Sequence, residues 1–198
     1  GYTGDNWTIN MGSYTGKNFA ISEDTLPISM YLRNDGLKMY VAGQTNNRIY
    51  QYTLSDAWNI SSATYDSKSI LITGTLLEGV RFKDDDGLKM WALGDNNYVY
   101  QYGLGVAWDV STATYQGSAL LSDSDNDNNA MFFKDDGTVL YSSGDQNDQI
   151  YQYDLTTAWN VSGILTVQQQ LNTGSKTAYP MGIFLGDNGT KLYVTTAV

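Results

Sequence analysis

Short apolar segments alternate with polar turns along the chain. In "PISMYLRNDGLKMYVAG" (27–43), two apolar segments flank a polar turn that ends in Asp-Gly. Such a dipeptide between apolar segments is typical of a β-hairpin, because glycine adopts positive φ without a steric cost. In the next segment, "RIYQYTL" (48–54), Tyr50 and Tyr52 alternate with other residues as in a strand. No segment has the period of an amphipathic helix, so the pattern predicts an all-β protein.

The same order of segments occurs four times, with a period close to 51 residues. Each complete unit contains four segments of strand character, and four antiparallel strands in such a length are typical of a β-propeller blade. Four recurring tryptophans mark one corner of each unit: Trp7, Trp58, Trp108 and Trp159. We therefore expect one domain over residues 1–198, an all-β propeller with four four-stranded blades. Their approximate bounds are 22–72, 73–121, 122–172, and 173–198 combined with 1–21.

These repeats resemble a family of tandem propeller repeats found in marine bacterial and phage-associated proteins. The similarity lies in segments such as "FKDDGTVLYSSG" and "IYQYDLTTAWNV", and it covers nearly the whole chain. The family pattern reads "F-x-x-D-G-T-K-M-Y … V-Y-Q-Y-D-L-S-T-A-W-D-V" and is related in style to the YVTN and NHL repeats. The resemblance implies the propeller fold and says little about function.

One position in the first segment of each unit is always small. Small side chains are expected where the innermost strands of a propeller converge on its axis. The next residue is large in every unit, and we expect it to fill the layer between neighbouring blades. The small residues are Ser29, Gly79, Ala130 and Gly182, and the large ones are Met30, Val80, Met131 and Ile183.

The last unit is incomplete. Relative to the other units, about six residues of its third strand are absent, while residues 13–21 could supply its outer strand. The chain could close as a four-bladed ring with one defective blade. It could instead be part of a longer protein, or form a homodimer through its incomplete blade edges.

Charge and composition exclude several functions. The net charge of −10 and pI of about 4.1 disfavour a nucleic-acid or anionic-membrane partner. The chain has no cysteine and no histidine, which excludes thiol chemistry, a Ser-His-Asp triad and most zinc sites. No apolar run is long enough to span a membrane, so no membrane insertion is expected. We predict an extracellular location, or one on a virion or cell surface.

The loops between the second and third segments are rich in amide and carboxylate side chains. Such groups can hydrogen-bond sugar hydroxyls, so these loops form a candidate binding face for a carbohydrate or protein ligand. Alternatively, Asn and Asp serve only as turn residues. The candidates are Asn46, Asn47, Arg48, Asp95, Asn96, Asn97, Asp145, Asn147 and Asp148.

Two further features suggest a site. Asp123, Asp125 and Asp127 alternate as in the first half of an EF-hand loop, which suggests calcium as a possible cofactor, although the loop glycine and the bidentate Glu are missing. A solvated turn is the alternative. Arg81 occupies a position that is aromatic in the other units, where it could stack on rings, pair with Glu78 or bind a ligand anion.

The sequence predicts no enzymatic activity. Glycoside hydrolysis requires two carboxylates that converge near the axis, but the inner segments carry only Glu78, and "KDDDG" (83–87) is interpreted as a turn. The predicted function is therefore a non-catalytic binding or adhesion module with a carbohydrate or protein partner. The alternatives are a protein-interaction scaffold in a larger surface or virion protein and, third, a propeller-type glycoside hydrolase.

Overall fold

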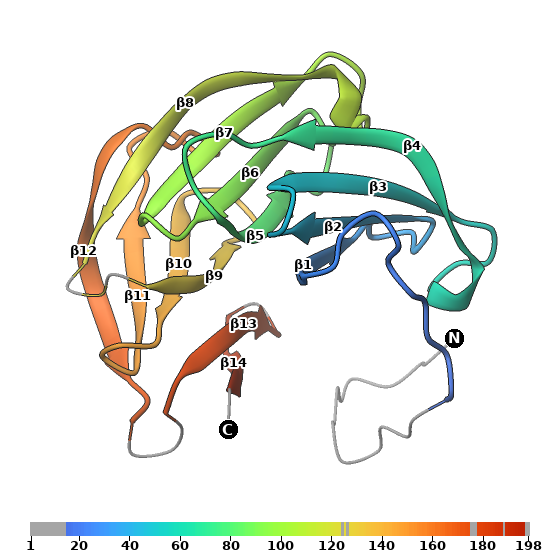
Figure 1. Cartoon of the computed structure of the whole chain (residues 1–198). Coiled ribbons are helices and arrows are strands. Elements are labelled where there is room, and N and C mark those ends of the chain that lie inside the picture. The colour runs from blue at the N-terminus through green and yellow to red at the C-terminus, as the bar shows by residue number, and fades with distance from the viewer. Residues whose placement is uncertain (1–14, 124, 126, 175–177, 188, 197–198) are drawn as a thin grey trace.

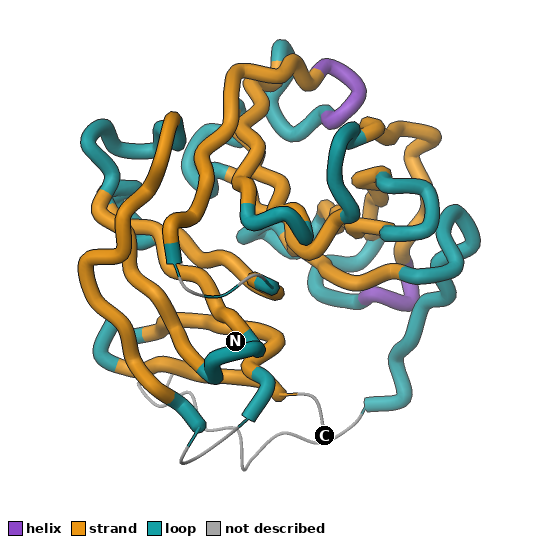
Figure 2. The backbone as a smooth tube through the Cα atoms, turned by 60° about the vertical axis from the view of Figure 1, so that its left-hand side comes forward, coloured by secondary structure: helices purple, strands orange, loops and turns teal. Residues whose placement is uncertain are grey.

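The computed structural model describes residues 15–123, 125, 127–174, 178–187 and 189–196, and these residues form an all-β arrangement (Figure 1). Trp7 and residues 13–14 of the expected outer strand lie outside the described residues. Short 3-10 turns interrupt the strands, η2 (Ile60–Ser62) and η3 (Val110–Thr112), as Figure 2 shows in purple. No helix in the described part of the chain is long and apolar enough to cross a membrane.

The strands follow the repeat. Unit 1 contains β1 (Pro27–Leu32), β2 (Lys38–Gly43), β3 (Arg48–Leu54) and β4 (Ala63–Leu71). Unit 2 contains β5 (Leu77–Phe82), β6 (Lys89–Gly94), β7 (Tyr98–Leu104) and β8 (Ala113–Ser122). Unit 3 contains β9 (Asn128–Phe133), β10 (Val139–Gly144), β11 (Gln149–Asp154) and β12 (Gly163–Asn172). Unit 4 contains β13 (Pro180–Gly186) and β14 (Lys191–Thr196).

The expectation of four four-stranded blades is correct only in part. Units 1 to 3 are antiparallel four-stranded meanders, but unit 4 is a two-stranded hairpin in the described residues. The outermost strands β8 and β12 also pair in parallel, over residues 119–122 and 163–166. This pairing joins units 2 and 3 into one eight-stranded mixed sheet.

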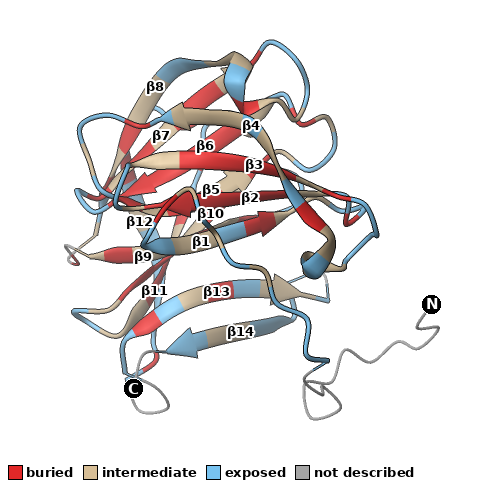
Figure 3. Cartoon of the chain, turned by 45° about the vertical axis from the view of Figure 1, so that its right-hand side comes forward, coloured by how far each residue is buried: buried red, intermediate tan, exposed pale blue. Residues whose placement is uncertain are grey.

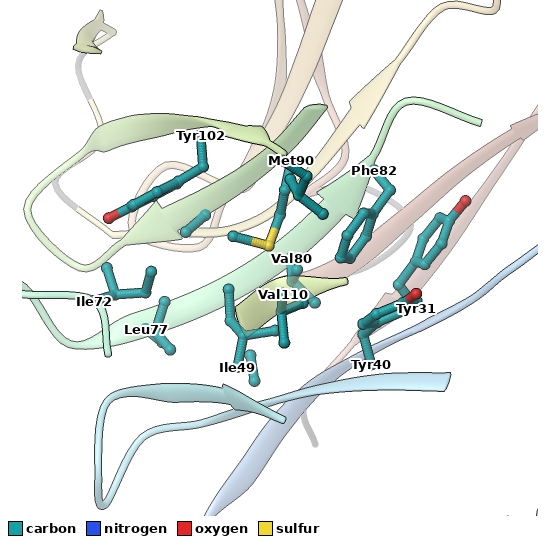
Figure 4. Close-up of a cluster of buried hydrophobic side chains, with 13 residues drawn as sticks. Tyr31, Tyr40, Ile49, Ile72, Leu77, Val80, Phe82, Met90, Tyr102 and Val110 are labelled. Carbon is teal, nitrogen blue, oxygen red and sulfur yellow. The ribbon is translucent and has the colours of Figure 1, made fainter. Parts of the chain in front are cut away.

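The units follow one another along an arc, with β1, β5, β9 and β13 innermost (Figure 1). Buried residues concentrate on the strands that face another unit, whereas β14 is largely exposed (Figure 3). Between units 1 and 2, Tyr40 and Ile49 point toward Val80, Phe82 and Met90 (Figure 4). An equivalent layer lies between units 2 and 3, where the ring of Trp91 is 4.3 Å from that of Phe133. The core is therefore a series of layers between units.

Each layer is reinforced by a hydrogen bond that the repeat reproduces. The Gln51 Oε1 atom accepts the backbone N–H of Val110 at 3.1 Å, and Gln101 Oε1 accepts that of Val161 at 2.9 Å. In both cases a buried amide on the third strand of one unit binds the corner backbone of the following unit. The low dielectric of the interior strengthens such a bond. Loss of the bond would also leave a buried amide unpaired, which is costly.

The recurring tryptophan closes the corner of its unit. Trp58, Trp108 and Trp159 adopt positive φ, and the N–H of Trp108 donates to the carbonyl of Gly87 at 3.0 Å. The indole ring lies so close to this glycine that an added Cβ would be 2.2 Å from it. Position 87 requires glycine for two reasons. Its backbone has φ +63°, which disfavours a residue with a Cβ, and the Trp108 ring leaves no space for a Cβ.

The expected outer strand of the last unit is not formed by residues 15–21, which contain no strand. Phe19 and Ile21 instead pack against Met39, Val41 and Tyr52 on the outward face of unit 1. The repeat aligns them with Ile70 and Ile72, which pack in the same way on unit 2. Residues 19–21 therefore lie where the last residues of a preceding unit would meet unit 1.

Substitution of Gly87 by Ala should lower the free energy of unfolding by about 3 kcal/mol or more. The left-handed backbone costs about 1–2 kcal/mol for a residue with a Cβ, and the clash with Trp108 adds about 1–3 kcal/mol. Gly74→Ala is the matched control, because Gly74 has φ +87° but an added Cβ would meet nothing within 4 Å. Urea unfolding of both variants separates the two costs, and equal losses would contradict a role for the indole contact.

Candidate functional site

The innermost strands end around one cavity of about 960 Å³. Its walls come from the ends of β1, β5, β9 and β13 and from the turns that follow them, so all four units contribute. The aromatic part of the lining includes Tyr31, Phe132 and Phe184. Two cations and five carboxylates also line it: Arg81, Lys134, Asp84, Asp85, Asp135, Asp136 and Asp187.

Arg81 is the half-buried cation of this cavity. Its Nε donates to the carbonyl of Met131 at 3.0 Å, and its guanidinium lies 6.0 Å from the centre of the Phe132 ring. Burial lowers the pKa of Arg81, while the Asp84 carboxylate opposes that shift. No ion pair with Glu78 is found in the described residues, so of the three predicted roles the structure shows stacking. No hydrogen bond of the terminal N–H groups of Arg81 is found within the described residues.

Asp84 lines the same cavity as Arg81, from the turn after β5. Its Oδ1 accepts a hydrogen bond from the hydroxyl of Tyr31, which belongs to unit 1. Asp84 is exposed on its outer side, yet partial burial of its carboxyl raises its pKa, and the charges of Asp135 and Asp85 add to the rise, whereas Tyr31 and Arg81 oppose it. The cavity therefore holds a carboxyl group with a raised pKa beside a second carboxylate and a guanidinium.

Sequence reasoning missed Asp84 because it treated "KDDDG" as an ordinary turn. This turn is one residue longer than its counterparts: Gly87 N donates to Lys83 O, four residues back, whereas Gly36 and Gly137 each donate three residues back. Asp84 and Asp85 of this turn line the cavity, as Asp135 and Asp136 of the unit 3 turn do. The recurrence of acidic turns after the innermost strands was visible in the sequence, but the direction of the Asp84 side chain was not.

Glu78 lies at the opposite end of β5, near the loops. Gln44 Nε2 donates to Glu78 Oε1 at 2.7 Å. Burial raises the pKa of Glu78 to about 7, and the charges of Asp127 and Asp95 contribute. Glu78 and Arg81 thus belong to different ends of the innermost strands.

The predicted loop residues are distributed over three separate turns. Asn47, Asn97 and Asp148 adopt φ of +50°, +62° and +54°, and their carbonyls accept the N–H groups of Ile72, Leu121 and Thr173. Asn and Asp tolerate this left-handed backbone better than most residues, which explains their recurrence without a ligand.

Four of the remaining loop candidates have local hydrogen-bond partners. Asn46 Nδ2 donates to the Glu23 carbonyl, Arg48 to Ser69, and Asn96 Nδ2 to the Gly74 carbonyl and Tyr100 hydroxyl, while Asp95 accepts from Thr75. Asp145 and Asn147 lie in the turn between β10 and β11. Their role in ligand binding remains a prediction.

Asp125 holds the turn of its own unit. Its buried carboxylate accepts the N–H groups of Asp127, Gln146 and Asn147 at 3.3, 3.2 and 3.0 Å. Asp24 does the same in unit 1, where the N–H groups of Leu26, Asn46 and Thr45 outweigh the effect of burial and lower its pKa.

Asp123 is also occupied by donors, because it accepts from the Tyr153 hydroxyl and from Asn128 Nδ2. Within the described residues, no three His, Cys, Asp or Glu side chains form a group that could hold a metal ion. Asp123 and Asp125 therefore accept hydrogen bonds from backbone, amide and hydroxyl donors in this structure, and calcium binding by Asp123, Asp125 and Asp127 remains a prediction.

No family model matches the sequence, and no curated protein sequence is similar to it. The family resemblance drawn from the repeats therefore remains a prediction. Solved structures do match the fold.

A proposed 6-phosphogluconolactonase from Bacteroides fragilis matches with a TM-score of 0.62 and 13% identity over 92% of this chain and 51% of its own. A second one, from Bacteroides uniformis, matches with a TM-score of 0.60 and 13% identity over 86% and 47%. The β-propeller domain of Cps50 (Swd1) from Myceliophteria thermophila matches with a TM-score of 0.56 and 11% identity over 85% and 48%. The chain thus has a propeller-like fold and spans about half the length of each of these structures.

The prediction that the chain is not an enzyme is corrected by these matches, because two of them are proposed lactonases. At such low identity the likeness itself establishes only the fold. The prediction considered only carboxylates on the innermost strands, where Glu78 stands alone. Asp84 and Asp135 line the cavity from the turns that follow β5 and β9.

Glu78→Gln should stabilise the protein at pH 8. The pKa of Glu78 rises from 4.5 to about 7 on folding, so the folded chain keeps this proton up to a higher pH than the unfolded chain does. The free energy of unfolding therefore falls as the pH rises from 4.5 to about 7. After allowance for solvent screening of a half-buried carboxyl, we expect a gain of roughly 1–2 kcal/mol at pH 8. The gain should shrink as pH falls toward 5. Urea unfolding across this range tests it, with the exposed Asp85→Asn as control, and a pH-independent difference would contradict it.

Asp125→Ala should destabilise unit 3 by about 2–4 kcal/mol, because three N–H groups lose their acceptor. Asp145→Ala, in the same turn, should change stability by less than about 0.5 kcal/mol. Thermal melts with calcium and with a chelator complete the test. A melting temperature that rises with calcium and depends on Asp125 would show that this carboxylate serves a metal.

Proposed function

We propose that the chain is a hydrolase domain. Its axial cavity would bind a neutral sugar lactone, and the residues there would hydrolyse the lactone ester. The observation that carries this proposal is the presence of Arg81 and Asp84 in one cavity with aromatic walls. A carboxyl with a raised pKa suits acid–base catalysis near neutral pH, and a guanidinium suits a developing oxyanion. The volume of about 960 Å³ is ample for a sugar ring.

The residues suggest one sequence of steps. The Asp84 carboxylate takes a proton from a water molecule, whose oxygen attacks the lactone carbonyl carbon. Terminal N–H groups of Arg81 donate to the carbonyl oxygen as it becomes negative. The ring C–O bond then breaks, and Asp84 returns the proton to the ring oxygen. Lactone and water thereby give one hydroxy acid.

The charges around the cavity favour an uncharged substrate. Asp84, Asp85, Asp135, Asp136 and Asp187 outnumber Arg81 and Lys134, and Lys134 is already paired with Asp136 at 2.6 Å. A phosphate would be repelled by this lining, whereas sugar hydroxyls can donate to the carboxylates and sugar C–H faces can lie on Phe132 and Phe184. This proposal keeps the predicted carbohydrate partner and moves its site from the loops to the axis.

Hydrolysis of glucono-δ-lactone and of its 6-phosphate, each corrected for spontaneous hydrolysis, tests the proposal. The neutral lactone should show a kcat/KM about tenfold higher or more. Asp84→Asn should lower kcat by about 100-fold or more, and Arg81→Met by a similar factor. The matched control is Asp35→Asn, in the equivalent turn of unit 1 but outside the cavity lining, which should retain activity.

Two outcomes would contradict the proposal. Turnover that survives Asp84→Asn would remove the assigned base. Absence of turnover would remove the reaction, and calorimetry with neutral sugars would then show whether an Arg81-dependent binding site remains.

A further inference from the structure

We propose that Tyr31 is a positioning residue of the axial cavity, whose hydroxyl, from unit 1, holds the Asp84 carboxyl of unit 2 in place for proton transfer. The hydroxyl donates a hydrogen bond to Asp84 Oδ1 across the joint between the two units. The catalytic consequence rests on the proposed function. The positioning itself does not, because it can be measured on the Asp84 carboxyl without any turnover.

The position of Tyr31 in the repeat shows that its hydroxyl is an exception. Arg81, Phe132 and Phe184 occupy the same position in the other units, and all four side chains line the cavity. Each contacts the following unit: the Arg81 guanidinium lies 6.0 Å from the centre of the Phe132 ring, and the Phe132 and Phe184 rings are 5.6 Å apart. A phenylalanine fills this position in units 3 and 4, so packing alone does not require the hydroxyl of Tyr31.

The Tyr31 ring is held firmly enough to fix the direction of its hydroxyl. Its side chain is 7% exposed. The ring centre lies 5.2 Å from that of Phe82 and 6.1 Å from that of Tyr40, and Figure 4 shows the three rings together. The ring also stacks on Trp108, at 6.3 Å with 12° between the planes. An aromatic side chain has only two dihedral angles, so this packing leaves the hydroxyl little freedom.

The Asp84 carboxyl has no such support of its own. Asp84 lies on an exposed turn, and the torsion of an aspartate carboxyl is broad. Within the part of the chain that the structure describes, the Tyr31 hydroxyl is the hydrogen-bond donor found for this side chain. The bond occupies Oδ1 and leaves Oδ2 for the water molecule of the proposed reaction. Without the bond, the carboxyl would be free to rotate away from the cavity.

The same hydrogen bond favours the ionised form of Asp84, which is the form that accepts a proton. Burial and the charges of Asp135 and Asp85 raise the pKa of Asp84, whereas the hydrogen bond from Tyr31 and the charge of Arg81 lower it. Burial and the bond to Asp84 raise the pKa of Tyr31, so the phenol keeps its proton and remains a donor. Loss of the hydroxyl should therefore raise the pKa of Asp84.

Tyr31→Phe removes the hydroxyl and keeps the ring. With glucono-δ-lactone as substrate, kcat should fall about tenfold or more, because the base is no longer aligned, and KM should change little. The acid limb of the pH profile of kcat/KM should move to higher pH, since less Asp84 is ionised at a given pH. A full rate and an unmoved limb in Tyr31→Phe would overturn the proposal.

Tyr40→Phe is the matched control for the loss of a buried hydroxyl. Tyr40 lies in the same layer, and its hydroxyl donates to the Trp108 carbonyl at 2.7 Å, but it does not line the cavity. Urea unfolding should show a similar loss of stability in both variants, while the control keeps the wild-type pH profile. The same shift of the acid limb in both variants would show that the effect comes from the packing layer, against the proposal.

A carbon-13 NMR titration of the Asp84 carboxyl tests the positioning without turnover, with Asp84→Asn to assign the signal. The midpoint should lie at higher pH in Tyr31→Phe than in the wild-type chain and in Tyr40→Phe. An unchanged midpoint in Tyr31→Phe would overturn the role of Tyr31, whatever the activity. A shifted midpoint in a chain that hydrolyses no lactone would remove the proposed reaction and still support Tyr31 as the group that positions Asp84.

Discussion

Burial of one unit by the next is the constraint on which this structure depends. A four-stranded meander has two apolar faces and covers neither by itself. Tyr40 and Trp91 are fully buried only because another unit packs over them. The stability of each unit is therefore a property of its neighbours, as in other repeat proteins. Met30 and Phe184, on the first and last units of the arc, are 48% and 45% exposed.

Most of the fold could be predicted from the period and from the turns. The Asp-Gly turns specify hairpins locally, and residues such as Gly79 indicate where strands converge. The parallel pairing of β8 with β12 could not be predicted, because it depends on how two units tilt relative to each other. The placement of Phe19 and Ile21 is an intermediate case. Their equivalence to Ile70 and Ile72 is visible in the sequence, but whether a strand forms there depends on partners that the repeat does not specify.

The site shows the same division. Arg81 could be identified because it interrupts an aromatic column of the repeat. Asp84 could not, because its direction is set by a hydrogen bond from Tyr31, 53 positions earlier. The amide-rich loops suggested a binding face, but the recurrence of Asn47, Asn97 and Asp148 follows from the left-handed backbone at these positions. A polar residue that recurs in every unit therefore indicates a backbone requirement first. A residue that departs from the repeat, such as Arg81, is the better indication of a functional site.

The glutamine bonds between units have a consequence for how such proteins change in length. Gln51 and Gln101 bind backbone N–H groups, at Val110 and Val161, and not particular side chains. Any unit that keeps the corner geometry presents the same donor, whatever its other residues. A gene duplication that adds a whole unit would therefore preserve this hydrogen bond at the new joint, whatever side chains meet in the layer beside it. Chains of this kind can gain or lose units as complete modules, while each unit diverges freely at its exposed positions.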